Sequence, residues 1–172
     1  EITERLKSEQ RLKDSLKDKD VLIKEVHHRV KNNLQIIASL LDMSKRRAQH
    51  PETIDILNEA LSKIYTMSLI HTQLYQSDRF DEINMGKNIR DLVNQLSQFY
   101  LGDRNIELSI YAPDIYLSVT QALPCALVVN ELVSNAFKYA FNGIEKGKIE
   151  ILLKKKKNII LLDVIDNGIG IP

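Results

Sequence analysis

The first fifty residues contain neither proline nor glycine, so nothing in them interrupts a helix. Within residues 22–41, apolar side chains recur at helical spacing: Ile23, Val26, Val30, Leu34, Ile37 and Leu41. An apolar stripe of this kind is stable only when another helix covers it. We therefore predict one continuous helix to about Arg47 that packs against a partner helix.

Two adjacent histidines on this helix are predicted to face different surroundings. At about 100° per residue, His28 projects nearly opposite the centre of the apolar stripe, whereas His27 lies on its flank. We expect His27 to be half-buried against a neighbour. His28 should be open to solvent, where another molecule or domain can react with it. His71 is predicted to be an ordinary polar residue of the next helix.

A second amphipathic helix should follow, because Pro51 suits the first turn of a helix and apolar residues recur from Ile54 to Leu74. Two long helices joined by a short connection form an antiparallel hairpin. Neither helix can cover both faces of the other, so we expect two hairpins to pair as a four-helix bundle in a homodimer. Residues 1–20 carry only a thin apolar stripe and are predicted to be a coiled-coil lead-in.

The second half of the chain changes to a mixed pattern. The predicted helices span residues 84–100, capped by Asn84, and 121–139, with Thr120 as N-cap and Pro124 in the first turn. The predicted strands span residues 106–110, 115–119, 148–155 and 158–165. This order is typical of a layered α+β domain, so the fold class is a helical hairpin followed by a two-layer α+β sandwich.

Composition narrows the function classes. The 24 basic and 23 acidic residues leave a net charge of +1, which gives no reason to expect nucleic acid as a partner. No run reaches the ~18 apolar residues of a membrane span, so no membrane contact is expected of this segment. A single cysteine, Cys125, fits a reducing compartment, and we expect a cytoplasmic location.

Two polar groups are candidates for a binding site. Glu131, Asn135 and Lys138 share an arc of about 60° on the predicted 121–139 helix, although alone they fit a solvated face. The segment Asp166-Asn167-Gly168-Ile169-Gly170 follows an apolar strand directly, and its glycines allow a ligand to approach the backbone. It too could be a surface turn by itself. Together the two groups favour a ligand site.

These residues also carry a resemblance to a known family. NELVSNAFKYA (130–140) resembles the N box of the Bergerat-type ATP-binding domain shared by sensor histidine kinases, gyrases, Hsp90 and MutL, and DNGIGIP (166–172) resembles its first glycine box. EVHHRVKNNLQ (25–35) resembles the phospho-acceptor motif of the kinase group, HisKA_2 or HWE-like, in which arginine follows the reactive histidine. The order of the motifs agrees, so the chain resembles a dimeric sensor histidine kinase.

The resemblance implies a role for each residue that matches a motif. His28 would be the phospho-acceptor. Asn135 would hold Mg²⁺ against the ATP phosphates, Lys138 would approach the phosphates, and Tyr139 would contact the nucleotide.

In the glycine box, Asp166 would accept a hydrogen bond from the adenine amino group, and Gly168 and Gly170 would shape the pocket. Glu131 would orient the attacking group or the metal shell, and Asn32 would assist dephosphorylation of a partner. The general base is left open, because Arg29 follows the histidine where most kinases have an acidic residue; Glu25 is a candidate.

The resemblance also implies partners and boundaries. We expect ATP and Mg²⁺ as cofactors, and a second copy and a response-regulator receiver domain as partners. The expected domains are a lead-in (1–20), a dimerisation and phosphotransfer domain (21–77), a linker (78–83) and an ATP-binding domain (84–172) whose ATP lid lies outside this sequence. Two alternatives stay open: a catalytically silent or engineered dimerisation scaffold, and an ATPase of the same superfamily.

Overall fold

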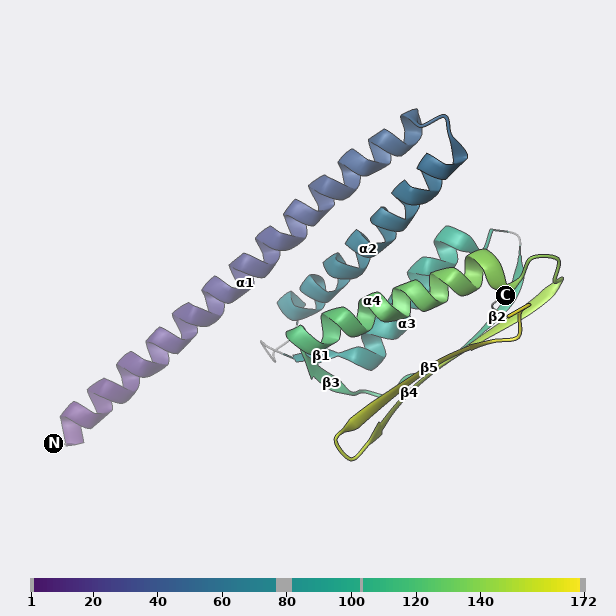
Figure 1. Ribbon diagram of the computed structural model, residues 1–172. Coiled ribbons are helices and arrows are strands. Elements are labelled where there is room, and N and C mark those ends of the chain that lie inside the picture. Colours follow the sequence, from purple (N-terminus) through teal and green to yellow (C-terminus); the bar gives the residue numbers. More distant parts are fainter. Residues whose placement is uncertain (1, 77–81, 103, 171–172) are drawn as a thin grey trace.

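The computed structural model describes residues 2–76, 82–102 and 104–170. Its N-terminal part is a helical hairpin, in which α1 (Ile2–Arg47) turns into the antiparallel α2 (Pro51–Gln76) (Figure 1). On either side of the turn, Ala48 N–H donates to Ser44 O at the end of α1, and Ile54 N–H donates to His50 O at the start of α2. Both helices and the break before Pro51 are as the sequence predicted.

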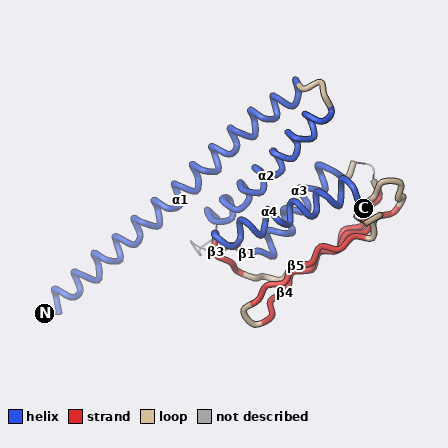
Figure 2. Tube along the Cα trace, in the orientation of Figure 1, coloured by secondary structure: helices blue, strands red, loops and turns tan. Residues whose placement is uncertain are grey.

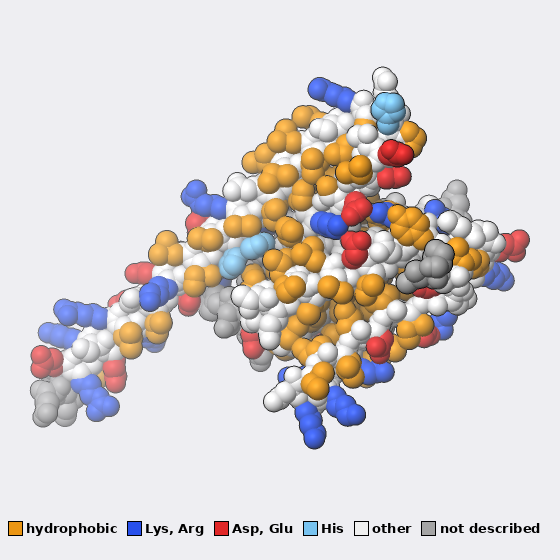
Figure 3. Space-filling view, viewed as in Figure 1, with side chains coloured by type: hydrophobic (Ala, Val, Ile, Leu, Met, Phe, Trp, Pro, Cys, Tyr) orange, Lys and Arg blue, Asp and Glu red, His pale blue; other side chains and the backbone are white. Residues whose placement is uncertain are grey.

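The apolar stripe of α1 is only partly covered within one chain. Ala38 is buried, and Val30, Leu34 and Leu41 are half-buried on the helix that α2 contacts. Large apolar side chains on the rest of the helix remain exposed, among them Ile23, Val26, Ile36, Ile37, Leu40 and Met43. Figure 3 shows apolar side chains gathered along the upper half of the hairpin.

The C-terminal part is a layer of helices on one face of a sheet (Figure 2). The helices are α3 (Met85–Tyr100) and α4 (Val119–Asn135), and α4 continues into a π-helix, η1 (Ala136–Ala140). In the sheet, β2 (Asn105–Tyr111) runs parallel to β4 (Lys146–Lys156), which pairs antiparallel with β5 (Ile159–Asp166). The predicted fold class, a helical region followed by an α+β domain, is confirmed.

Local signals explain part of this domain. The Asn84 side chain accepts a hydrogen bond from Lys87 N–H at 3.0 Å, so the predicted cap of α3 is confirmed. The strands alternate as expected, since Ile149, Ile151 and Leu153 of β4 are buried while the intervening residues are more exposed.

Three local predictions were wrong. Helix α4 follows Ser118, so Thr120 is inside the helix and Pro124 lies beyond its first turn. Glu82 and Ile83, expected to be the end of the 78–83 linker, belong to a strand, β1 (Glu82–Asn84), antiparallel to β3 (Tyr116–Ser118). Its pairing depends on tertiary burial, because Ile83 and Leu117 face each other and both are buried. The other residues of that linker, 78–81, lie outside the described residues.

The hydrophobic core joins the hairpin to the sheet domain. Ile70 and Leu74 of α2 belong to the same buried cluster as Ile89 of α3, Val133 of α4 and Ile151 of β4. The second half of α2 is therefore a wall of the C-terminal domain as well as an arm of the hairpin.

Across residues 2–76, 82–102 and 104–170, no helix combines the length and apolar character required to cross a membrane.

Candidate functional site

The change from α-helix to π-helix at the end of α4 shapes the candidate binding site. Turns of π-helix are rare in proteins, and those that occur often lie at functional sites. Two contacts hold this one in place. The Phe137 side chain is buried in the core, and the Phe137 carbonyl accepts a hydrogen bond from Arg104 Nη1 at 2.6 Å. The segment that carries Tyr139 is therefore fixed from both sides.

The glycine turn after β5 packs directly on this π-helix. Ile169 N–H donates to Ala140 O at 2.9 Å, and a Cβ on Gly168 would lie only 2.2 Å from that same carbonyl oxygen. Only glycine permits this approach. The Asp166 carboxylate accepts a hydrogen bond from Gly168 N–H at 2.9 Å, which fixes its direction at the strand end.

Between the π-helix and the turn lies a cavity of about 470 Å³. Its lining consists of Leu132, Asn135, Ala136, Tyr139, Ala140, Val164, Asp166 and Gly170. Two motifs more than thirty residues apart in sequence thus meet at one cavity. A mostly apolar lining with a few convergent polar groups is typical of small-molecule sites.

The lining fits a nucleotide chemically. Leu132, Ala136 and Val164 can pack on a flat ring, and a carboxylate such as Asp166 can accept a hydrogen bond from an amino group. No group of three or more His, Cys, Asp or Glu side chains gathers as a metal site within the described residues. A Mg²⁺ ion that arrives with a nucleotide does not require such a group, because it commonly binds through one or two protein oxygens together with phosphates.

The two other predicted residues of the α4 face do not line this cavity. Glu131 and Lys138 point toward α2, where Lys138 Nζ lies 3.7 Å from Glu59 Oε2. Lys63 Nζ lies 2.7 Å from Glu59 Oε1 and 3.2 Å from Glu131 Oε2. In Figure 3, acidic and basic side chains meet where α2 and α4 lie side by side. The hydrogen bond from Lys63 lowers the pKa of the Glu59 carboxyl, and in return Glu59 raises the pKa of Lys63.

A buried polar contact beside this network was missed by the sequence reasoning. Asn130 is 1% exposed, and its Nδ2 lies 3.2 Å from Ser62 O, 2.7 Å from Ser62 Oγ and 2.7 Å from Thr66 Oγ1. The signal was present, because Asn130 lies four residues after Ala126 and three before Val133, on the buried face of α4. A polar residue on such a face requires a buried partner.

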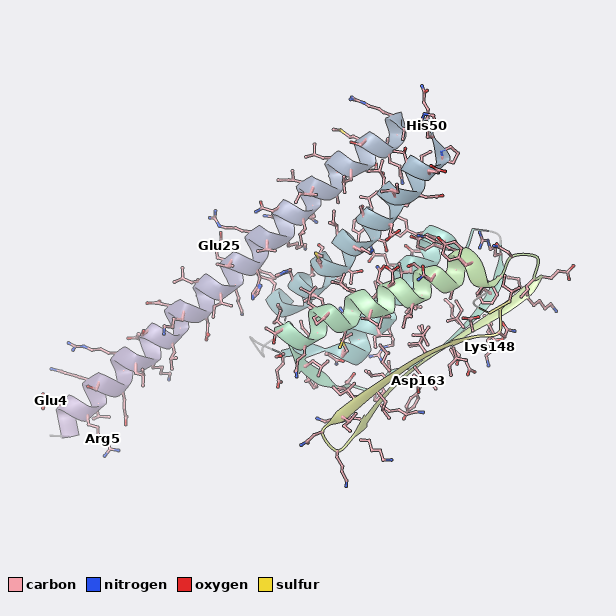
Figure 4. All side chains as sticks on the ribbon, in the orientation of Figure 1. Glu4, Arg5, Glu25, His50, Lys148 and Asp163 are labelled. Atoms are coloured by element: carbon pink, nitrogen blue, oxygen red, sulfur yellow. The ribbon has the colours of Figure 1, made fainter. Side chains whose placement is uncertain are left out.

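His28 is exposed on α1, as its helical position predicted. Asn32 Nδ2 lies 3.4 Å from His28 Nδ1, and the Tyr75 ring centroid on α2 lies 5.7 Å from that of His28. Glu25, labelled on α1 in Figure 4, accepts a hydrogen bond from Arg29 Nε at 2.7 Å. Its carboxylate is thus engaged by Arg29, one residue after His28.

His27 is half-buried, as predicted, and its neighbour is His71. The two Nδ1 atoms lie 3.0 Å apart across the hairpin. Burial lowers the pKa of His71, and the adjacent His27 lowers it further. His71 is therefore more than an ordinary surface residue of α2.

The structure does not bring His28 and the cavity together. His28 lies beside Tyr75, whereas the end of α4 that lines the cavity contacts Glu59. These two residues of α2 are sixteen positions apart, about 24 Å at the helical rise of about 1.5 Å per residue.

Both parts of the chain match known protein families. Residues 25–100 match a histidine kinase family (HisKA_2), and residues 120–172 match the histidine kinase-, DNA gyrase B- and HSP90-like ATPase family. The chain is 30% identical over 159 residues to the sensor histidine kinase PdtaS of Mycobacterium tuberculosis, and 32% identical over 161 residues to PdtaS of Mycolicibacterium smegmatis. Each alignment covers 92% of this chain, which spans about a third of the length of each relative (32%).

A solved structure shares the fold. The histidine kinase domain of the Erythrobacter litoralis EL346 blue-light activated histidine kinase superposes with a TM-score of 0.61 at 21% identity, over 92% of this chain and 74% of that one. A helical acceptor region and an ATPase-type domain, each matched separately and in the expected order, identify the chain as a member of the histidine kinase family.

Proposed function

We propose that this chain is the core of a sensor histidine kinase, which transfers the γ-phosphoryl group of ATP to His28 and then to an aspartate of a response-regulator receiver domain. One observation carries the proposal: Asn135 and Asp166, from two distant motifs, line a single cavity. Because ATP is the donor, we place this segment in the cytoplasm.

In the cavity, each residue has a distinct task. Asp166 accepts a hydrogen bond from the adenine amino group, and Tyr139 packs beside the nucleotide. Gly168 and Gly170 keep the turn close to the π-helix. Asn135 would supply an oxygen ligand for Mg²⁺, whose charge would offset that of the phosphates, and Lys138 would turn from Glu59 to approach the phosphates.

At the acceptor, the neutral imidazole of His28 attacks the γ-phosphorus, which suits neutral pH because the pKa of histidine is about 6.5. A P–N bond forms, the bond from the γ-phosphorus to the bridging oxygen breaks, and ADP leaves. The imidazole proton passes to a base, for which Glu25 is the candidate once it separates from Arg29. Asn32, whose Nδ2 lies 3.4 Å from His28 Nδ1, assists dephosphorylation of the partner.

We further propose that a second copy covers the exposed part of the α1 stripe. Ile36, Leu40 and Met43 are each more than half exposed in the single chain. Pairing two hairpins would bury them in a four-helix bundle. Residues 21–77 would then be the dimerisation and phosphotransfer domain, preceded by the 1–20 lead-in. The ATP-binding domain would begin at β1 (Glu82–Asn84), two residues earlier than the predicted boundary at residue 84.

The test is incubation of this chain with Mg²⁺ and ATP labelled in the γ-phosphoryl group. We expect acid-labile label on the protein, absent from His28→Gln and retained by the matched control His27→Gln. Addition of a receiver domain should then remove the label. Phosphate release without labelled protein would identify an ATPase instead, and no reaction in a chain extended through the ATP lid would identify a silent scaffold.

A further inference from the structure

Four charged residues connect α2 to the end of α4, and we call them the Glu59 network: Glu59, Lys63, Glu131 and Lys138. Glu59 is its centre, because one carboxylate oxygen faces Lys63 at 2.7 Å and the other faces Lys138 at 3.7 Å. The Lys138 side chain is 18% exposed, so most of its surface is packed against the protein. Its remaining neighbours include the Tyr100 ring, whose centroid lies 5.7 Å from Lys138 Nζ.

Lys138 lies at the border between two cavities. It lines a cavity of about 740 Å³ formed by α2, the end of α3 and the π-helix, together with Glu59, Tyr100 and Tyr139. Tyr139 also lines the candidate nucleotide cavity. Lys138 is therefore adjacent in sequence to a residue of the nucleotide cavity, but its ammonium is directed to the other side.

We infer that Glu59 competes with the nucleotide for Lys138 and so lowers the affinity of this chain for ATP and ADP. The inference rests on the proposed function, in which Lys138 approaches the phosphates. The carboxylate and a phosphate are both anions, and one ammonium group cannot be fully paired with both. If Lys138 must leave Glu59 before the nucleotide binds, the apparent affinity falls in proportion to the fraction of molecules in which Lys138 is free of Glu59.

The competition acts in both directions. If Glu59 weakens nucleotide binding, bound nucleotide must weaken the contact between Glu59 and Lys138 by the same factor. That contact holds the cavity end of α4 about 24 Å along α2 from the level of His28. Bound nucleotide would thus loosen one of the contacts that keep the ATP-binding domain away from the acceptor.

Removal of Glu59 should leave the fold intact. Lys63 keeps its ion pair with Glu131 at 3.2 Å, and Asn130 keeps its buried contacts with Ser62 and Thr66. Glu59 itself is 41% exposed, so Gln at this position stays in contact with water. The substitution Glu59→Gln therefore changes the partner of Lys138 while the other contacts between α2 and α4 remain.

The experiment measures Mg²⁺–ADP binding by calorimetry, because ADP binds without phosphoryl transfer. We compare the wild-type chain with Glu59→Gln and with the control Glu52→Gln, which removes the same charge from another residue of the same cavity. Partly exposed ion pairs contribute little free energy, so we expect ADP to bind Glu59→Gln only about two- to fivefold more tightly than the wild type. Glu59→Lys, which repels Lys138, should strengthen binding further, whereas Glu52→Lys should not.

Each outcome is informative. Equal affinity in the wild type and both Glu59 variants would overturn the inference and leave the proposed function standing, and so would equal gains in the Glu52 and Glu59 variants. Absence of ADP binding in every variant would refute the proposed function and the inference with it. Circular dichroism of each variant confirms that the helices are retained.

Discussion

His27 and His71 face each other across the helical hairpin with their Nδ1 atoms 3.0 Å apart, directly beside the exposed His28. A hydrogen bond at this distance requires one nitrogen to donate a proton and the other to accept it. At least one of the two imidazoles must therefore be neutral. The pair links α1 to α2 at the level of the proposed phospho-acceptor.

The free energy of unfolding should depend on this pair at mildly acidic pH. Burial and the neighbouring His27 lower the pKa of His71 below its ordinary value of 6.5. The unfolded chain then takes up a proton more readily than the folded one. The contribution of neutral His71 to the free energy of unfolding is complete above about pH 6.5. It is lost as the pH falls through the lower pKa that His71 has in the folded state.

Urea unfolding at about pH 7.5 and about pH 5.5 checks this expectation. His71→Gln should reduce the loss of stability on acidification, because it removes the group whose pKa differs between the two states. His50→Gln is the control, since His50 is exposed at the turn between α1 and α2. The same pH dependence in wild type and His71→Gln would contradict the prediction.

The buried amide of Asn130 should contribute strongly to stability. Asn130→Ala leaves Ser62 and Thr66 without this donor in a buried contact, which should cost about 1–3 kcal/mol of unfolding free energy. Chemical denaturation gives the value directly. Asn94→Ala, at an exposed position of α3, should change it by less than about 0.5 kcal/mol. Similar values for the two variants would show that the contact between α2 and α4 carries little stability.

The close approach of Gly168 to the π-helix should control nucleotide binding. In Gly168→Ala the new Cβ would meet Ala140 O at 2.2 Å, so the turn must move away and displace Asp166. We expect Mg²⁺–ADP affinity to fall about tenfold or more, since overpacking of this kind costs about 1–3 kcal/mol.

The matched control is Gly102→Asn, where φ is +50° and the space around the position is open. Asparagine tolerates this backbone conformation. Unchanged ADP binding in Gly168→Ala would show that the turn and the cavity are independent.

The exposed part of the α1 stripe should determine the oligomeric state. Ile36 and Leu40 are 60% and 55% exposed in one chain, and burial of each in a dimer is worth about 1.5–3 kcal/mol. Ile36→Glu combined with Leu40→Glu should convert a dimer into a monomer in light scattering. Leu161→Glu, on the exposed side of β5, should leave the dimer intact. A wild-type monomer, or a dimer that survives both changes on α1, would argue against the hairpin interface.

Much of the fold could be predicted from local patterns. The uninterrupted stretch before Pro51 and the helical repeat of apolar residues gave α1 and α2, and alternation gave β2, β4 and β5. Strand β1 was missed, because its three residues have no local signal and depend on pairing with β3. The start of α4 was misplaced by two residues, because the predicted cap Thr120 lies inside the helix.

The candidate site, like the fold, was predicted only in part from the sequence. Sequence motifs named Asn135, Asp166 and the glycines. The structure places Asn135, Asp166 and Gly170 around one cavity, and Gly168 packs against Ala140 beside it. The sequence also grouped Glu131 and Lys138 with Asn135 on one helical arc. The structure separates them, because α2 packs along α4 and supplies Lys63 and Glu59 as opposite charges.

The order of residues alone determined which segments are helical and which histidine is exposed, since these follow from periodicity and spacing along one element. Only the tertiary structure decided that α2 shares the core of the C-terminal domain, that Asn130 is buried against Ser62, and that Lys138 faces Glu59. These contacts join segments about sixty to eighty residues apart in sequence. No periodicity within one helix specifies which face of another helix will meet it, because that depends on how all the apolar surfaces are buried together.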